Sequence, residues 1–197
     1  MDDQAGRTYA IAFLGEARTP IRTSVVRLGA DDDPRVVAES LRHAESDRLS
    51  DPILSAGLGG PRDPERSLHL TALHAEQAVR LGRALNGPGR VTAFADLGPY
   101  CFVLGRPTEE IRIFCRTILG PLAESAQRDE LRTLEEFLRA HGSVNAVARA
   151  LFLHRNTVRQ RLRRIADLTG ADLEDADQRV QLYLAVLGQN ALRELAS

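Results

Sequence analysis

The stretch from Ser143 to Leu168, SVNAVARALFLHRNTVRQRLRRIADL, constrains the fold of this chain more than any other. Apolar residues recur at intervals of three and four in its first part, at Val144, Val147, Ala148 and Leu151. This spacing predicts a short helix with one apolar face. Gly142 and Ser143 precede it, and this pair is typical of a helix end followed by the N-cap of the next helix.

A second helix is predicted from about Arg155 to Leu168, with His154 as its N-cap and Gly170 at its end. Its apolar stripe consists of Val158, Leu162 and Ile165. The opposite side carries Asn156, flanked by Gln160 and Arg163, with Arg159 and Arg164 on the shoulders. Because only residues 152–154 separate the two helices, the stretch predicts a helix-turn-helix.

Two observations weigh against a specialised role for this stretch. The turn position that is often glycine in this motif is Phe152 here, which departs from the generic pattern. All 26 basic residues of the chain are arginine, which indicates a coding bias and lowers the weight of any single arginine. The alternative interpretation is an arginine-rich solvated face on an ordinary helical hairpin, and the pattern alone leaves it open.

The polar side of the second helix carries the groups that read the major groove of DNA, since Asn and Gln can pair with adenine and Arg with guanine. We predict base contacts by Asn156, Arg159, Gln160 and Arg163. Phosphate contacts, which fix the register without reading sequence, are predicted for Ser143, Arg155, Thr157 and Arg164. One such helix covers few base pairs, so we expect a homodimer on a repeated operator sequence.

The segment LFLHRNTVRQRLRRI, continuing into ADLTGADLEDADQRVQLYLAVL, resembles the C-terminal helix-turn-helix domain of the PucR family of bacterial transcriptional regulators, which includes the CdaR sugar-diacid regulators. The resemblance is specific from Leu131 to about Leu187, and its core HRNTVRQRL is also similar to the factor for inversion stimulation. It implies an effector-responsive regulator that binds double-stranded operator DNA through this module. Such regulators usually carry a further N-terminal sensory region, which this chain is too short to contain.

Upstream, PGRVTAFADLGPYCFVL and ILGPL resemble the degenerate GGDEF-like domain of the same family. The resemblance implies an α+β chain, with a GGDEF-like α/β domain over residues 1–127 and an all-α helix-turn-helix domain over residues 128–197. Alternation of strand and helix signals supports the first domain. The expected strands are residues 8–14, 23–28, 52–58, 91–95 and 100–104, the last two forming a hairpin, and the expected helices are residues 34–47, 64–85 and 108–127.

No enzymatic activity is expected from this sequence. Nucleotide cyclisation by a GGDEF domain needs the GG[DE]EF signature, and the nearest approach, residues 59–63, lacks its paired acids. The glycines of residues 57–60 match neither a P-loop nor a dinucleotide fingerprint, which leaves a phosphate-binding turn there as a weak alternative. Asp31 to Asp33 precede Pro34 and are interpreted as a helix start rather than a metal site. We therefore predict neither a cofactor nor a metal.

Composition narrows the partners and the compartment. The net charge of −1 argues against sequence-independent coating of DNA, although five arginines face a single acid, Asp167, between His154 and Leu168. Scarce aromatic residues disfavour stacking on single-stranded nucleic acid. Cys101, in an expected strand, and Cys115, in an expected helix, are predicted to be buried reduced thiols. The sequence has neither an apolar run of membrane-spanning length nor a signal-peptide core, which predicts a cytoplasmic protein without membrane contact.

Two further hypotheses remain compatible with these observations. The near-neutral charge also fits a protein-interaction module that keeps the family fold without reading DNA. Sensing of an unidentified small-molecule effector by the first domain is compatible with DNA binding by the second.

Overall fold

The computed structural model describes residues 6–16, 20–62, 64–124 and 127–196. By its internal contacts the chain divides into two compact units, Met1–Gly105 together with Arg193–Ser197, and Arg106–Leu192. The first is a mixed α/β unit and the second is helical, so the expected α+β class is confirmed. The family-domain boundary expected between residues 127 and 128 stays a prediction.

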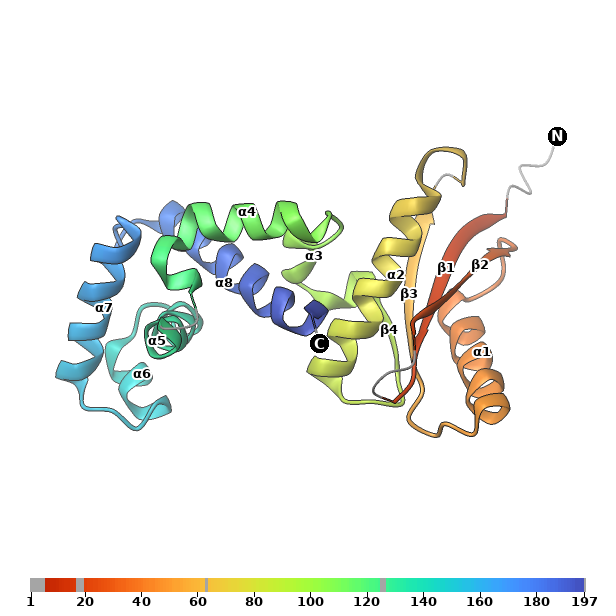
Figure 1. The fold of residues 1–197 in the computed structure, drawn as a ribbon, viewed down its shortest axis with the longest axis horizontal. Helices are drawn as coiled ribbons and strands as arrows, with labels where there is room; N and C mark the ends of the chain where they lie inside the picture. The colour runs from red at the N-terminus through yellow and green to blue at the C-terminus, as the bar shows by residue number, and fades with distance from the viewer. Residues whose placement is uncertain (1–5, 17–19, 63, 125–126, 197) are drawn as a thin grey trace. The chain divides into compact units, whose positions relative to one another are not determined.

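The first unit contains a sheet of the strands β1 (Arg7–Leu14), β2 (Arg22–Leu28), β3 (Ser55–Arg62) and β4 (Val91–Ala93). Their order is β2-β1-β3-β4, with β4 parallel to β3 and the other neighbours antiparallel. The helices α1 (Pro34–Leu49) and α2 (Pro64–Asn86) cover opposite faces of this sheet (Figure 1). The predicted strand over residues 8–14 and both predicted helices are confirmed to within a few residues.

The two faces of the sheet differ in side-chain size. On β1, Tyr9, Ile11 and Phe13 lie in the cluster that packs against α1, whereas Ala10 and Ala12 lie in the cluster that packs against α2. Strand side chains alternate between faces, so this alternation of large and small residues assigns each face its helix. The face with the small residues lets α2 lie close to the strands.

The glycines of β3 extend this close approach to the backbone itself. A Cβ added at Gly57 would lie 2.1 Å from the carbonyl oxygen of Ala75, and one at Gly59 would lie 2.2 Å from that of Thr71. These glycines therefore leave room for α2 to rest on the strand backbone. The interpretation of residues 57–60 as a turn after the strand is wrong, because β3 continues through Arg62.

The acidic start of α1 is a cap, as predicted. The Asp33 carboxylate accepts a hydrogen bond from the Arg35 amide at 2.8 Å, and Pro34 occupies the first turn. Asp32 accepts from the Gly29 amide at 2.8 Å. Both carboxylates thus satisfy backbone donors at the turn that enters the helix.

The predicted hairpin over residues 91–104 is wrong in its second half. After β4 the chain forms a 3-10 helix, η1 (Phe94–Leu97), and a short helix, α3 (Tyr100–Val103). Tyr100, Val103 and Leu104 are buried, and their spacing of three and four residues is that of a helix face. Gly98, with φ of +58°, separates the two helical turns.

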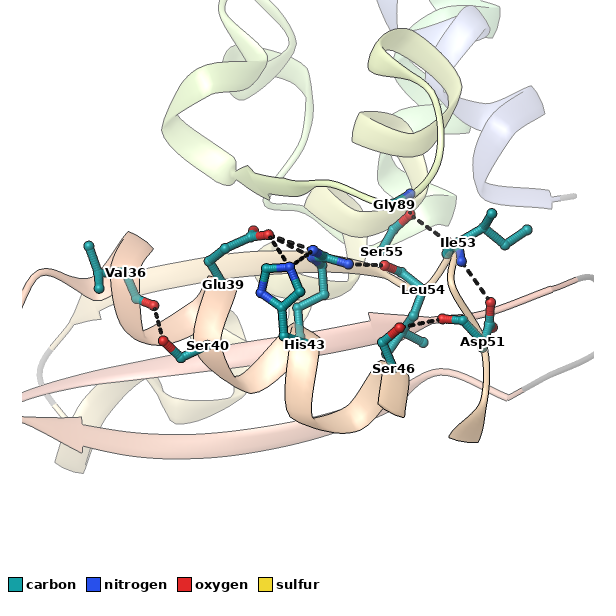
Figure 2. Close-up of polar contacts among 11 residues, drawn as sticks. Val36, Glu39, Ser40, His43, Ser46, Asp51, Ile53, Leu54, Ser55 and Gly89 are labelled. Atoms are coloured by element: carbon teal, nitrogen blue, oxygen red, sulfur yellow. Dashed lines mark hydrogen bonds and ion pairs between the residues drawn. The ribbon is translucent and has the colours of Figure 1, made fainter. Parts of the chain in front are cut away.

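A polar network holds the loop between α1 and β3 (Figure 2). Arg42 is only 6% exposed, and its guanidinium donates to Oε1 of Glu39 at 2.6 Å and to the carbonyl oxygen of Leu54 at 3.3 Å. The Ser46 hydroxyl donates to the carbonyl oxygen of Asp51 at 2.6 Å. The buried arginine therefore satisfies a helix carboxylate and a loop carbonyl together.

The second unit contains five helices and a 3-10 turn among the described residues. They are α4 (Thr108–Leu119), η2 (Gly120–Ala123), α5 (Arg128–Arg139), α6 (Val144–Ala150), α7 (Arg155–Thr169) and most of α8 (Ala176–Ala196). The helix predicted over 108–127, with a kink or restart at Gly120-Pro121, is interrupted there, because Gly120 takes a φ of +52° and η2 follows α4. Val180 of α8 is 58% exposed, and the buried stripe of α8 begins at Leu182.

The two cysteines are free thiols. Cys115 on α4 is buried, its Sγ donates to the carbonyl oxygen of Ala185 at 3.4 Å, and burial raises its pKa to about 11. Cys101 is half-buried and lies on α3, so its predicted strand is wrong, and burial raises its pKa as well. Both thiols are therefore protonated at neutral pH.

No helix among the described residues combines the length and the hydropathy that a bilayer span requires.

We expect Glu39→Gln to be less stable than the wild type at pH 7, by at most about 1 kcal/mol because the Glu39 side chain is 42% exposed and solvent screens the pair. Hydrogen bonds from Arg42 lower the pKa of Glu39 below its ordinary 4.5. The wild-type advantage is therefore complete above that ordinary value and disappears as the pH falls through the lowered one.

Urea unfolding followed by circular dichroism, in steps from pH 7 to about pH 2, measures this difference. Asp31→Asn is the matched control, since Asp31 forms no ion pair within the described residues. A gap between Glu39→Gln and wild type that stays constant or widens in acid would contradict the assignment.

Candidate nucleic-acid interface

The helix-turn-helix is built from two capped helices. The Ser143 hydroxyl accepts from the Ala146 amide at 3.3 Å at the start of α6, and Nδ1 of His154 accepts from the Asn156 amide at 3.2 Å at the start of α7. An accepting Nδ1 places the proton of the neutral ring on Nε2. Gly170, with φ of +69°, ends α7. All three predicted terminal residues are confirmed in these roles.

The two helices pack through the predicted apolar stripe. Val147 of α6 and Val158 and Ile165 of α7 are fully buried, and Leu162 is nearly so. Burial of four such side chains favours the fold by roughly 1.5–3 kcal/mol each. This stripe fixes which side of α7 faces the protein core.

The turn between the helices contains a strained aromatic residue. Phe152 has a φ of +55°, in the left-handed region, and its side chain is 95% exposed. A bulky L-residue in that region costs about 1–2 kcal/mol. The departure from glycine noted in the sequence thus falls at a position whose backbone favours glycine, and the phenyl ring gains no burial in compensation.

The four predicted base-contacting residues are all exposed on α7. Asn156, Arg159, Gln160 and Arg163 are on the side opposite the buried stripe. Nη1 of Arg159 lies 3.5 Å from Oδ1 of Asn156, a distance at the limit of a hydrogen bond. Within the described part of the chain, Gln160 and Arg163 have neither a hydrogen bond nor an ion pair through their side chains. Their polar groups are thus available to a partner.

The predicted phosphate-contacting residues differ in their surroundings. Ser143 and Arg155 are exposed, and Thr157 is half-buried. Arg164 is exposed but already paired, because its guanidinium lies 3.3 Å from Oε1 of Glu130 and donates to Oε1 of Gln127 at 3.4 Å.

Arg161 has a clearer structural role. Its guanidinium donates to Oδ2 of Asp129 at 2.8 Å and to the Thr133 hydroxyl at 3.3 Å. Together with the Arg164–Glu130 pair, this contact attaches α7 to the first turn of α5. Only two of the five arginines of α7 are therefore neutralised by carboxylates within the described residues.

Sequence reasoning missed the part played by Asp129 and Glu130. Acids in the first turn of a helix are ordinarily explained by the helix dipole. Their partners lie 32 and 34 residues further along the chain, and no periodic signal connects positions that far apart.

We expect Phe152→Gly to raise the free energy of unfolding by about 1 kcal/mol, because glycine relieves the left-handed strain and loses no buried surface. Denaturant titration of the intact chain measures the change. Phe102→Gly is the matched control: Phe102 is 77% exposed but lies within α3, where glycine costs about 1 kcal/mol. Destabilisation by both substitutions would refute the strain at Phe152.

Residues 131–187 match the family model of the PucR C-terminal helix-turn-helix domain. The carbohydrate diacid regulator of Escherichia coli (strain K12) is 47% identical over 55% of this chain and 34% of that protein. The purine catabolism regulatory protein of Bacillus subtilis (strain 168) is 35% identical over 44% of this chain and 17% of that protein.

An uncharacterized protein in the pkwA 5' region of Thermomonospora curvata is 43% identical over 40% of this chain and 45% of that protein. The matched parts make up less than half of each of these three relatives. The match to the family model covers most of α5, all of α6 and α7, and the first half of α8, and so includes the whole helix-turn-helix. Through residues 131–187, this chain is therefore similar to the PucR C-terminal helix-turn-helix domain.

Proposed function

We propose that this chain is a sequence-specific transcriptional regulator that binds double-stranded operator DNA with α7 in the major groove. The exposed amide and guanidinium groups of α7, opposite a fully buried apolar stripe, carry the proposal. The regulatory names of two relatives support it.

The proposed base contacts are Asn156, Arg159, Gln160 and Arg163. Their amide and guanidinium groups can form paired hydrogen bonds with adenine and guanine edges. Gln160 and Arg163 are the strongest candidates, since their side chains have no partner in the described residues that DNA would have to displace.

The proposed phosphate contacts are Ser143, Arg155, Thr157 and Arg164. Arg164 would exchange Glu130 and Gln127 for a phosphate oxygen, so part of its binding energy is offset by the contacts it leaves. Glu130 is nearly buried, and DNA binding would leave its carboxylate with fewer partners. We therefore expect Arg164 to contribute less affinity than Arg155, whose guanidinium pairs with no carboxylate in the described parts of the chain.

A homodimer is the proposed binding form. One recognition helix covers few base pairs, and dimers of this motif bind half-sites about one helical turn of DNA apart. A repeat with that spacing in selected operator sequences would support the dimer. The first unit is proposed as the part that couples an effector or a second copy to DNA binding.

Selection from a random duplex pool, followed by titration of the intact chain, tests the proposal. Gln160→Ala and Arg163→Ala should each cost roughly 1–3 kcal/mol against the selected operator, with relaxed preference at one base position. Arg164→Ala should weaken operator and random duplexes alike. Arg161→Ala, the matched control for charge, should act chiefly on stability because Arg161 is bound to α5.

The same titration separates DNA binding from the alternative of a protein-interaction module. A DNA reader must show salt-sensitive affinity even for a random duplex at low salt. Absence of that affinity, or equal effects of Gln160→Ala and Arg164→Ala on all sequences, would reject groove reading and favour the interaction module.

A further inference from the structure

A groove outside the exposed face of α7 is formed where α5 ends and α8 begins. It has a volume of about 530 Å³ and is lined by Leu138, Arg139, His141, Gly142, Arg179 and Tyr183, among others. The exposed Val180 also borders it. The groove ends at Gly142, the residue directly before Ser143 at the start of α6.

The charge of this groove comes chiefly from one arginine. Arg179 is half-buried, and within the described residues its guanidinium has neither a carboxylate partner nor a hydrogen bond. Arg139 is different, because its guanidinium lies 2.8 Å from Oε1 of Glu135. A partly desolvated cation that has no carboxylate within ion-pair distance among the described residues favours an anionic occupant.

Arg179 lies next to the start of the helix-turn-helix. A Cβ added at Gly142 would lie 3.2 Å from Nη1 of Arg179, so the guanidinium lies against the backbone of the α5–α6 loop. The next residue in the chain after Gly142 is Ser143, a proposed phosphate contact. In this motif the helix before the recognition helix crosses the DNA backbone, which brings the sugar-phosphate strand to the start of α6.

We propose that this groove holds the DNA backbone, with Arg179 contacting a phosphate one step beyond the phosphate at Ser143. The proposal rests on the proposed function and deepens it, because it extends the DNA-binding surface from α7 and α6 to α8. Val180 and Tyr183 lie beside the arginine, where they can pack against deoxyribose. The polar and apolar parts of the groove thus match the alternating phosphate and sugar of one strand.

Salt titration of the intact chain on its selected operator and on a random duplex tests the proposal. Arg179→Met keeps much of the packing volume and removes the charge. It should reduce the slope of log K against log salt concentration by about 0.9, equally on both duplexes. Arg179→Lys, which keeps the charge, should restore most of the slope. Arg116→Ala removes an exposed arginine that lines a different cavity and should leave the slope unchanged.

Three results would overturn the proposal. The first is an unchanged slope for Arg179→Met while Arg163→Ala still relaxes the base preference at one operator position. This result would leave the reading of the DNA major groove by α7 intact. The second is thermal stabilisation by inorganic phosphate alone that Arg179→Met abolishes without changing the slope, which assigns the groove to a small anion. The third is a change in sedimentation with Arg179→Met at an unchanged slope, which assigns it to a second copy of the chain.

Discussion

Burial of the apolar stripe of α7 is the interaction on which the candidate interface depends. Val158, Leu162 and Ile165 are inaccessible to solvent or nearly so, and they fix the rotation of the helix about its axis. A helix turns by about 100° per residue, so fixing one side determines the direction of every other side chain. The amide and guanidinium groups are exposed for that reason, whatever their own preferences.

Electrostatics adds a second constraint on the same helix. Asp129 and Glu130 pair with Arg161 and Arg164 along the edge of α7 that faces α5. The carboxylates thereby remove positive charge from that edge and leave it on the opposite one. A chain with a net charge of −1 can in this way present a local cationic surface.

Local signals allowed most of the helical unit to be predicted from the sequence. The capping residues Ser143 and His154 and the terminal Gly170 act on their own helix ends, and the apolar spacing within α6 and α7 is short-range. The strand predicted for residues 100–104 is wrong, because the apolar residues there fit a short strand and a helical turn equally well. Only the packing around η1 and α3 distinguishes the two.

Features that depend on distant partners could not be predicted. The attachment of Arg161 to Asp129 joins positions far apart in sequence, and the exposed Val180 precedes Leu182, where the buried stripe of α8 begins. The local composition of residues 57–60 predicts a turn, whereas these glycines lie in β3 and make room for the backbone of α2. A glycine-rich composition indicates a flexible backbone, but it does not indicate which element packs against that backbone.

The contact of α2 with β3 also has a mechanical consequence. Where side chains separate a helix from a sheet, their rotamers can absorb small displacements of either element. At Gly57 and Gly59 no side chain intervenes, and the two backbones meet directly. Close-packed interiors transmit strain. A displacement of β3 at these glycines would therefore displace α2 as well, with almost no absorption by side-chain rotamers.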